Sequence, residues 1–195
     1  MPVDERRQQL LELGADLFAR HSFAELSMAR IAREAGISKP LLYHYFPSKR
    51  DYFLATLSEG VAQLAERTAP APGASPIEAL SGSVGAFLDW VGDRDLAYRK
   101  LLETAGEVPE VKALIDEVRD RTSAQIIEGL GFEDRPPPKV RAAVRGWLWL
   151  MDGAILDWLE HRDLTRDELR DLLLGSLAGA LVAADAGDAL TASSG

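Results

Sequence analysis

The 195-residue chain contains no cysteine, which excludes disulfide bridges and metal sites built on thiolates. It also lacks a long apolar run. The longest, Leu172–Ala184, is too short to cross a bilayer, and the N-terminal MPVDERRQQL has no apolar core of the kind found in a signal peptide. We therefore expect a soluble, cytoplasmic protein with no membrane contact. Hydrophobic residues make up 47% of the chain, enough for one sizeable core or for a small domain attached to a larger one.

The sequence has none of the common motifs of enzymes. It contains no G-x-S-x-G elbow, no H-E-x-x-H zinc motif, no phosphate-binding loop and no dinucleotide fingerprint. The three histidines, His21, His44 and His161, are far apart and do not have the spacing of metal ligands. The sequence therefore predicts a protein that is not an enzyme and that uses neither cofactor nor metal.

Basic charge is scarce overall but unevenly distributed. The net charge is −9, yet residues 1–50 carry eight Lys or Arg and six Asp or Glu, whereas residues 51–195 carry 14 basic and 25 acidic residues. Residues 37–50 hold three basic side chains and no acid. Because phosphate neutralisation supplies most of the non-specific affinity for nucleic acid, a DNA-binding surface is expected only in the N-terminal quarter. The acidic remainder would keep the rest of the protein away from a duplex.

Residues 27–46 predict two short helices joined by a tight turn. Ser27 is a suitable N-cap for the first helix, Gly36 fits the left-handed position that ends it, and Ser38 can cap the second helix. Such a pair is either an ordinary αα-hairpin with a solvated face or a helix-turn-helix that binds DNA. In the second helix the inward positions are Leu42, Tyr45 and Phe46, and the outward positions are Lys39, Leu41, Tyr43 and His44.

The wider pattern around this hairpin favours the DNA-binding interpretation. It resembles the TetR family of transcriptional repressors, whose N-terminal domain has the pattern T-(x)3-IA-(x)2-AG-(x)-S-(x)3-LY-(x)-YF-(x)-SK. The residues in those places here are Ser27, Ile31, Ala32, Ala35, Gly36, Ser38, Leu42, Tyr43, Tyr45, Phe46, Ser48 and Lys49. The resemblance covers about residues 4–64. Pro40 and Leu41 depart from it, because the family more often has a small residue and Thr there, and this would alter base preference rather than the class.

The resemblance implies a role for each exposed residue of the hairpin. The residues placed near bases are Lys39, Pro40, Leu41, Tyr43 and His44. Those placed on phosphates are Ser27, Ser38, Tyr45 and Lys49. Lysine can donate hydrogen bonds to base edges and leucine can contact a thymine methyl group, so Lys39 and Leu41 are the expected base readers. For Tyr45, packing in the core is an equally good alternative to a phosphate contact.

The whole chain is expected to be all-α, with about nine helices. After a helix over 4–20 and the two short ones, helices are predicted over 48–67, 76–91, 95–105, 109–130, 139–161 and 166–185. No segment alternates like a strand. We expect a helix-turn-helix domain over 4–64 and an effector-binding and dimerisation domain over 65–195, with the helix over 48–67 connecting them.

The helices over 139–161 and 166–185 are apolar on more than one face. Either both are buried within a monomer, or one face of each packs on a second copy, with small residues such as Gly175 and Gly179 permitting close approach. TetR-like proteins dimerise through their last two long helices, which implies a homodimer. A two-fold axis would place two recognition helices about 34–36 Å apart, so the expected partner is double-stranded DNA with a pseudo-palindromic operator.

Apolar side chains of the central helices are candidates for a small-molecule pocket. They are Phe87, Trp90, Tyr98, Leu101, Leu102, Trp147, Met151 and Ile155. The alternative is that these residues are plain core. Asp152 and Asp157 either meet a cationic ligand or face solvent or an arginine. The predicted function is a repressor that a small apolar or aromatic ligand releases from its operator. The alternative is a ligand-independent helix-turn-helix module of the same fold that binds DNA or protein.

Overall fold

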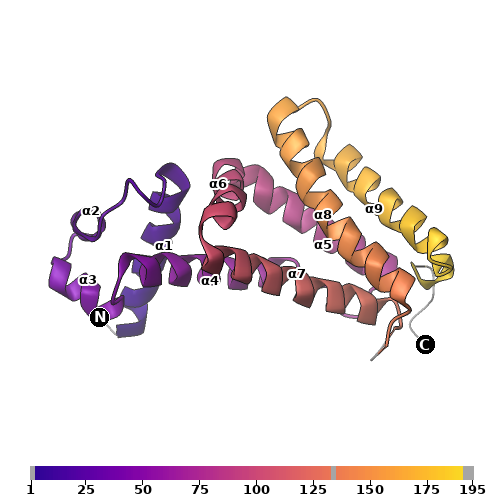
Figure 1. Cartoon of the computed structure of the whole chain (residues 1–195), viewed down its shortest axis with the longest axis horizontal. Coiled ribbons are helices and arrows are strands. Elements are labelled where there is room, and N and C mark those ends of the chain that lie inside the picture. Colours follow the sequence, from indigo (N-terminus) through magenta and orange to yellow (C-terminus); the bar gives the residue numbers. More distant parts are fainter. Residues whose placement is uncertain (1–2, 133–134, 191–195) are drawn as a thin grey trace. The chain divides into compact units, whose positions relative to one another are not determined.

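A computed structural model describes residues 3–132 and 135–190, in which all regular secondary structure is helical (Figure 1). These ranges contain nine α-helices and one 3-10 helix. Their bounds are α1 Val3–Arg20, α2 Met28–Glu34, α3 Lys39–Tyr45, α4 Lys49–Arg67, α5 Pro76–Asp93, α6 Asp95–Glu107, α7 Pro109–Gly129, α8 Pro138–His161, α9 Arg166–Ala183 and η1 Gly187–Leu190. The all-α prediction is confirmed. The end of the predicted C-terminal domain, 191–195, lies outside the described residues.

Local signals account for most helix starts. Proline is the first residue of α5, α7 and α8, where its missing N–H has no intrahelical partner to lose. A capping box begins α9, because Thr165 Oγ1 accepts from the Glu168 N–H at 3.2 Å and the Glu168 carboxylate accepts from the Thr165 N–H at 2.8 Å. Ser75 and Glu78 make the corresponding contact before α5, at 3.0 Å. Donation from the capping hydroxyl and N–H holds the pKa of both glutamates below its ordinary value.

Helix α9 ends at Ala183, two residues before the predicted end. The Asp185 N–H donates to Val182 O at 3.1 Å and the Ala186 N–H donates to Leu181 O at 2.9 Å, a Schellman pattern. Asp185 itself is left-handed, with φ of 60°. Position 185 is not a glycine, the residue that usually marks such a helix end, so the sequence did not predict where α9 ends.

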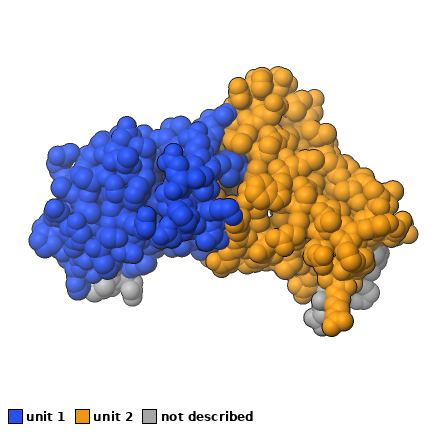
Figure 2. Space-filling view, viewed as in Figure 1, with its two compact units in different colours: residues 1–64, 94–114 blue, residues 65–93, 115–195 orange. Residues whose placement is uncertain are grey.

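The chain divides into two compact units, which Figure 2 colours separately. Unit 1 comprises residues 1–64 and 94–114, and unit 2 comprises residues 65–93 and 115–195. Unit 1 therefore contains α6 and the start of α7 in addition to the helices of the predicted N-terminal domain. Contact between α1 and α6 accounts for this difference from the predicted boundary. Helices α4 and α7 each continue from one unit into the other.

The core of unit 2 is formed where α9 packs on α8 and α5. In Figure 1, α8 and α9 run side by side. The inward face of α9 carries leucines at a spacing of four residues, each at most 1% exposed: Leu169, Leu173, Leu177 and Leu181. From α8, the Trp147 indole N–H donates to Leu173 O at 2.8 Å. No helix within residues 3–132 and 135–190 is both long and apolar enough to span a membrane.

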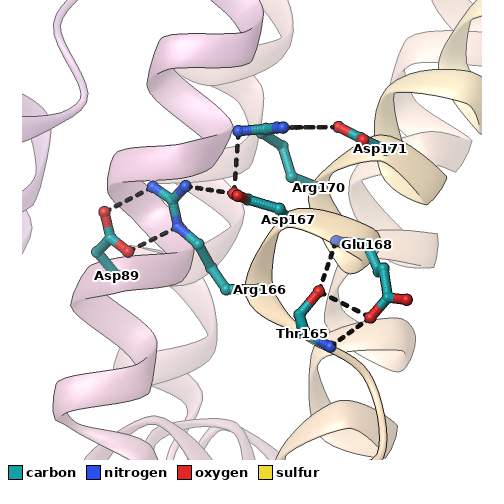
Figure 3. A network of polar contacts seen from close by, with 7 residues as sticks. All are labelled: Asp89, Thr165, Arg166, Asp167, Glu168, Arg170 and Asp171. Carbon is teal, nitrogen blue, oxygen red and sulfur yellow. Dashed lines mark hydrogen bonds and ion pairs between the residues drawn. The ribbon is translucent and has the colours of Figure 1, made fainter.

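Arg166 joins the start of α9 to α5 (Figure 3). Its guanidinium donates to both carboxylate oxygens of Asp89, Nε to Oδ1 at 2.7 Å and Nη2 to Oδ2 at 2.6 Å, and Nη1 donates to Asp167 at 2.8 Å. The guanidinium lies against Gly85, where an added Cβ would be 2.9 Å from Nη2. A side chain at residue 85 would therefore displace this forked ion pair.

Candidate DNA-binding surface

The first part of the surface is α2 and the turn that follows it. Ser27 Oγ accepts from the Arg30 N–H at 3.2 Å, which leaves the hydroxyl proton of this exposed serine available for another acceptor. At the other end Gly36 has φ of 65°, and the Ile37 N–H donates to Ala32 O at 3.0 Å. The predicted left-handed glycine is confirmed, and it reverses the chain within a few residues.

Helix α3 is fixed by its cap and by two buried side chains. Ser38 Oγ accepts from the Leu41 N–H at 3.3 Å, and Pro40 lies in the first turn. Leu42 is 0% exposed and Phe46 is 2% exposed, so one side of α3 is in the core, as predicted. Helix α3 is therefore short, and the burial of Leu42 and Phe46 fixes which of its sides faces the core.

The opposite side of α3 faces solvent. Lys39 and His44 are exposed, and two large apolar side chains accompany them, with Leu41 39% and Tyr43 41% exposed. Lys39 Nζ lies 5.7 Å from the centre of the Tyr43 ring. The predicted outward set is confirmed as exposed. Tyr45 is half-buried, with its ring 5.7 Å from that of His44, so both alternatives for Tyr45 remain.

An aromatic cluster between α1 and α4 supports these helices. The rings of Phe18 and Phe53 are 4.5 Å apart, and those of Phe46 and Tyr52 are 4.8 Å apart. The Tyr52 hydroxyl donates to Leu10 O at 2.5 Å, and burial raises the pKa of Tyr52 well above its ordinary value. The cluster joins the end of α3 to both neighbouring helices.

Lys49, the first residue of α4, lies half-buried behind the hairpin. Its Nζ donates to Phe23 O at 2.7 Å and to Leu26 O at 2.9 Å, and it lies 4.2 Å from the centre of the Phe23 ring. These contacts are all within unit 1. The family resemblance assigns Lys49 to phosphate, and that role remains a prediction.

Two further contacts of unit 1 were not predicted. Arg50 Nη1 donates to Glu110 Oε1 at 2.9 Å, which joins α4 to the first turn of α7. The guanidinium of Arg30 contacts His21 Nε2 at 2.9 Å. Arg50 and Glu110 are distant in sequence, and His21 lies in a loop. Neither pair therefore has a periodic sequence pattern that would predict it.

The predicted pocket residues are divided between the units. Tyr98, Leu101 and Leu102 are in unit 1, and the other five are in unit 2. Within unit 2 the rings of Phe87 and Trp90 stack at 6.5 Å. The three residues from α8 are at most 7% exposed: Trp147, Met151 and Ile155. Whether any of the eight contacts a ligand remains a prediction.

The two aspartates of α8, Asp152 and Asp157, have basic neighbours. The Asp152 carboxylate accepts from Arg119, whose guanidinium lies 4.0 Å from the centre of the Trp149 ring. Asp157 lies 3.4 Å from His161, and contact with Asp157 raises the pKa of that histidine. For Asp152 the sequence predicts either a cationic ligand or solvent or an arginine, and in the structure it pairs with Arg119. In the part of the chain that the structure describes, no three His, Asp or Glu residues form a group that could hold a metal ion.

Helices α2 and α3 are both capped by serine and are joined by a turn at Gly36, and the second of them exposes a lysine, a leucine and a tyrosine. This arrangement is that of a helix-turn-helix protein. Comparisons with known proteins agree. Residues 10–56 match the family described as bacterial regulatory proteins, tetR family, and residues 76–179 match the family described as tetracyclin repressor-like, C-terminal domain. The chain belongs to the TetR family of bacterial transcriptional regulators.

Individual relatives support this assignment. A tetR-family transcriptional regulator from Streptomyces coelicolor is 32% identical with a TM-score of 0.85, covering 98% of this chain and 89% of that one. A TetR-like regulator from Rhodococcus sp. RHA1 is 28% identical with a TM-score of 0.72, covering 93% and 98%. The HTH-type transcriptional activator FasR of Mycolicibacterium smegmatis is 35% identical over 105 residues, 53% of this chain and 48% of FasR. The chain thus spans about half the length of this curated relative.

Proposed function

We propose that this protein regulates transcription in the cytoplasm by binding a pseudo-palindromic operator as a homodimer. Residues 4–64 form the DNA-binding domain in this proposal, and α3 enters the major groove. The observation that carries it is the outward face of α3, where Lys39, Leu41, Tyr43 and His44 are exposed while Leu42 is fully buried. Large apolar side chains held exposed on a rigid helix are typical of a binding surface.

The exposed residues differ in the contacts they can make. Lys39 can donate to base edges and Leu41 can contact thymine methyl groups. Ser27 and Ser38 accept from backbone N–H groups through Oγ, so each can still donate its hydroxyl proton to a phosphate oxygen. Lys39 and Leu41 should therefore determine which base sequence is preferred, and Ser27 and Ser38 should determine the register of the protein on the duplex.

Selection from a random duplex library, followed by binding titrations, tests the proposal. Lys39→Ala and Tyr43→Ala should each lose operator binding, with helix content and oligomeric state unchanged. Lys139→Ala removes the same charge from unit 2 and should bind as the wild type does. If Lys39→Ala and Tyr43→Ala bind normally, α3 is not the recognition helix.

The proposed dimer interface is the exposed apolar face of α8 and α9. On α8, Trp149 is 60% and Leu150 46% exposed, and on α9, Leu172 is 56% and Val182 66% exposed. Among the described residues of unit 2 these are the most exposed large apolar side chains, and they lie on the two helices predicted to dimerise. A second copy is the occupant that we propose for this face, since burying it would remove apolar area from water.

Glycines on the same helices support this assignment. A Cβ added at Gly146 or Gly153 of α8, or at Gly175 or Gly179 of α9, would meet nothing within 4 Å. Packing within the protomer therefore gives no reason for glycine at these positions. Glycine in a helix interior costs about 1 kcal/mol relative to alanine, so close approach by a second copy would explain its presence.

The glycines also allow a direct test of the interface. Gly82→Ala on α5, where an added Cβ also meets nothing, should stabilise the protein by up to about 1 kcal/mol. Gly175→Ala should weaken dimerisation instead, as measured by sedimentation over a dilution series. If Gly175→Ala dimerises as tightly as the wild type, the interface lies elsewhere.

For regulation, we propose that a small apolar or aromatic ligand binds among the apolar side chains of the central helices and shifts the population away from the DNA-binding state. Helix α4 leads from the DNA-binding domain into unit 2, so it is the expected connection. We propose a repressor, although FasR is named an activator. Expression of a reporter gene placed under the selected operator distinguishes repression from activation. If no ligand weakens operator binding or raises the melting temperature, the module is ligand-independent.

A further inference from the structure

The loop over residues 21–26 carries the chain from α1 into α2, and Lys49 holds its end. We infer that Lys49 is a positioning residue that fixes this loop and thereby the start of α2, instead of a ligand of DNA phosphate. The inference rests on the proposed function, because it concerns how the hairpin proposed to bind DNA is held in position.

The hydrogen bonds of Lys49 support a positioning role. An ammonium group has three N–H donors, and two of them go to Phe23 O and Leu26 O at 2.7 and 2.9 Å. Leu26 immediately precedes Ser27, the N-cap of α2. Lys49, the first residue of α4, is therefore hydrogen-bonded to two carbonyl groups of the loop that precedes α2, so it joins the segments on either side of the hairpin.

The packing of Phe23 strengthens the link. Lys49 Nζ lies 4.2 Å from the centre of the Phe23 ring, and this ring lies 5.2 Å from Phe53 and 6.4 Å from Phe18. One ammonium group thus holds both the backbone and the ring of Phe23. At the other end of the loop the Ser22 N–H donates to Glu25 at 2.8 Å, so the loop is fixed on two sides.

The neighbouring cations have different surroundings. Lys39 is exposed on the outer face of α3, and the Arg50 side chain is 56% exposed. Lys49 is half-buried, and only one of its N–H groups is uncommitted. A phosphate oxygen would have to displace a carbonyl group to receive more than one hydrogen bond from it.

Salt dependence separates a positioning lysine from a phosphate ligand. Each neutralised phosphate contributes about 0.9 to the slope of log affinity against log salt, so loss of one contact per subunit changes the slope of a dimer by about 1.8. We expect Lys49→Met, in the full-length protein, to bind the selected operator about tenfold more weakly at every salt concentration, with an unchanged slope. Hydrogen exchange of residues 21–28 in the free protein should be faster than in the wild type.

Lys39→Met is the matched control, because it also removes one charge per subunit but leaves the loop intact. It should leave exchange over residues 21–28 unchanged. A Lys49→Met slope that falls by about 1.8, with exchange unaltered, would identify Lys49 as a phosphate ligand and overturn the inference. Unchanged affinity and exchange would overturn it as well.

A second measurement applies even if Lys49→Met does not fold. In the wild-type protein the 15N signal of the Lys49 ammonium should be observable, because two hydrogen bonds slow its exchange, and it should show no coupling to phosphorus when the operator is added. Coupling to phosphorus would overturn the inference. A wild-type chain that selects no duplex would refute the proposed function instead, and the exchange comparison without DNA would still decide whether Lys49 fixes the loop.

Discussion

Replacing Gly14 with alanine should destabilise the DNA-binding unit, although alanine is the better helix former. Gly14 lies in α1 where that helix crosses α4. A Cβ added there would lie 2.5 Å from Thr56 Oγ1 and 2.8 Å from the Tyr52 hydroxyl. Neither neighbour can move freely, because Thr56 Oγ1 donates to Tyr52 O and the Tyr52 hydroxyl donates to Leu10 O.

The magnitude follows from opposing contributions. Alanine gains about 1 kcal/mol of helix propensity over glycine. Overpacking typically costs 1–3 kcal/mol, and displacing the buried Tyr52 hydroxyl from its acceptor costs about 1 kcal/mol more. The net loss for Gly14→Ala is therefore about 1–3 kcal/mol. For a unit of this size, the corresponding fall in the melting temperature is on the order of 5–15 °C.

Circular dichroism and tryptophan fluorescence together provide the assay. All four tryptophans lie in unit 2, so fluorescence follows that unit while the helical signal follows both. Gly14→Ala should lower the melting temperature seen by circular dichroism and should weaken operator binding. Gly60→Ala on α4 is the control, because an added Cβ there meets nothing within 4 Å and should be neutral or stabilising. If Gly14→Ala is as stable as Gly60→Ala, the close approach of α1 and α4 is not as described.

The other predictions concern unit 2 and the helix caps. Asp89→Asn should lower the free energy of unfolding by about 1 kcal/mol, because Arg166 would lose a carboxylate that accepts two of its hydrogen bonds. Asp120→Asn is the control: it alters an exposed ion pair with a single contact, and should change the free energy of unfolding by less than about 0.5 kcal/mol. Urea titration measures both changes. Lowered pKa values at Glu78 and Glu168 stabilise the folded state above the unfolded pKa of about 4.5, and this contribution is lost as the pH falls through the lower folded values. The melting temperature should therefore fall as the pH drops below about 4.5, and Glu168→Gln should reduce that dependence.

Features encoded by neighbouring residues could be predicted from the sequence. The turn at Gly36, the caps at Ser27 and Ser38, and the capping box at Thr165 each depend on residues within five positions of one another. The outward face of α3 follows from helical periodicity once Leu42 is placed in the core. The all-α fold is the sum of such local signals.

Features that depend on distant pairs could not be predicted. The contact of α1 with α6, which brings residues 94–114 into unit 1, joins segments far apart in the chain and has no periodic signature. The same holds for Arg50 and Glu110, which are separated by 60 positions. For Lys49 the partners are carbonyl groups, and every residue has one, so side-chain identity carries no information about them.

These long-range contacts change the meaning of the local charge. Residues 37–50 have three basic residues and no acid, which on counting alone suggests three cations facing DNA. In the structure Lys49 donates to loop carbonyls, Arg50 donates to Glu110, and Lys39 is the member of the three on the outer face of α3. Non-specific attraction by one subunit should therefore be weaker than the sequence count implies, since it scales with the phosphates neutralised. Specific affinity would then depend on the uncharged contacts of α3 and on presenting two copies of it at once, so the dimer interface proposed on α8 and α9 would contribute to DNA binding by pairing the two subunits.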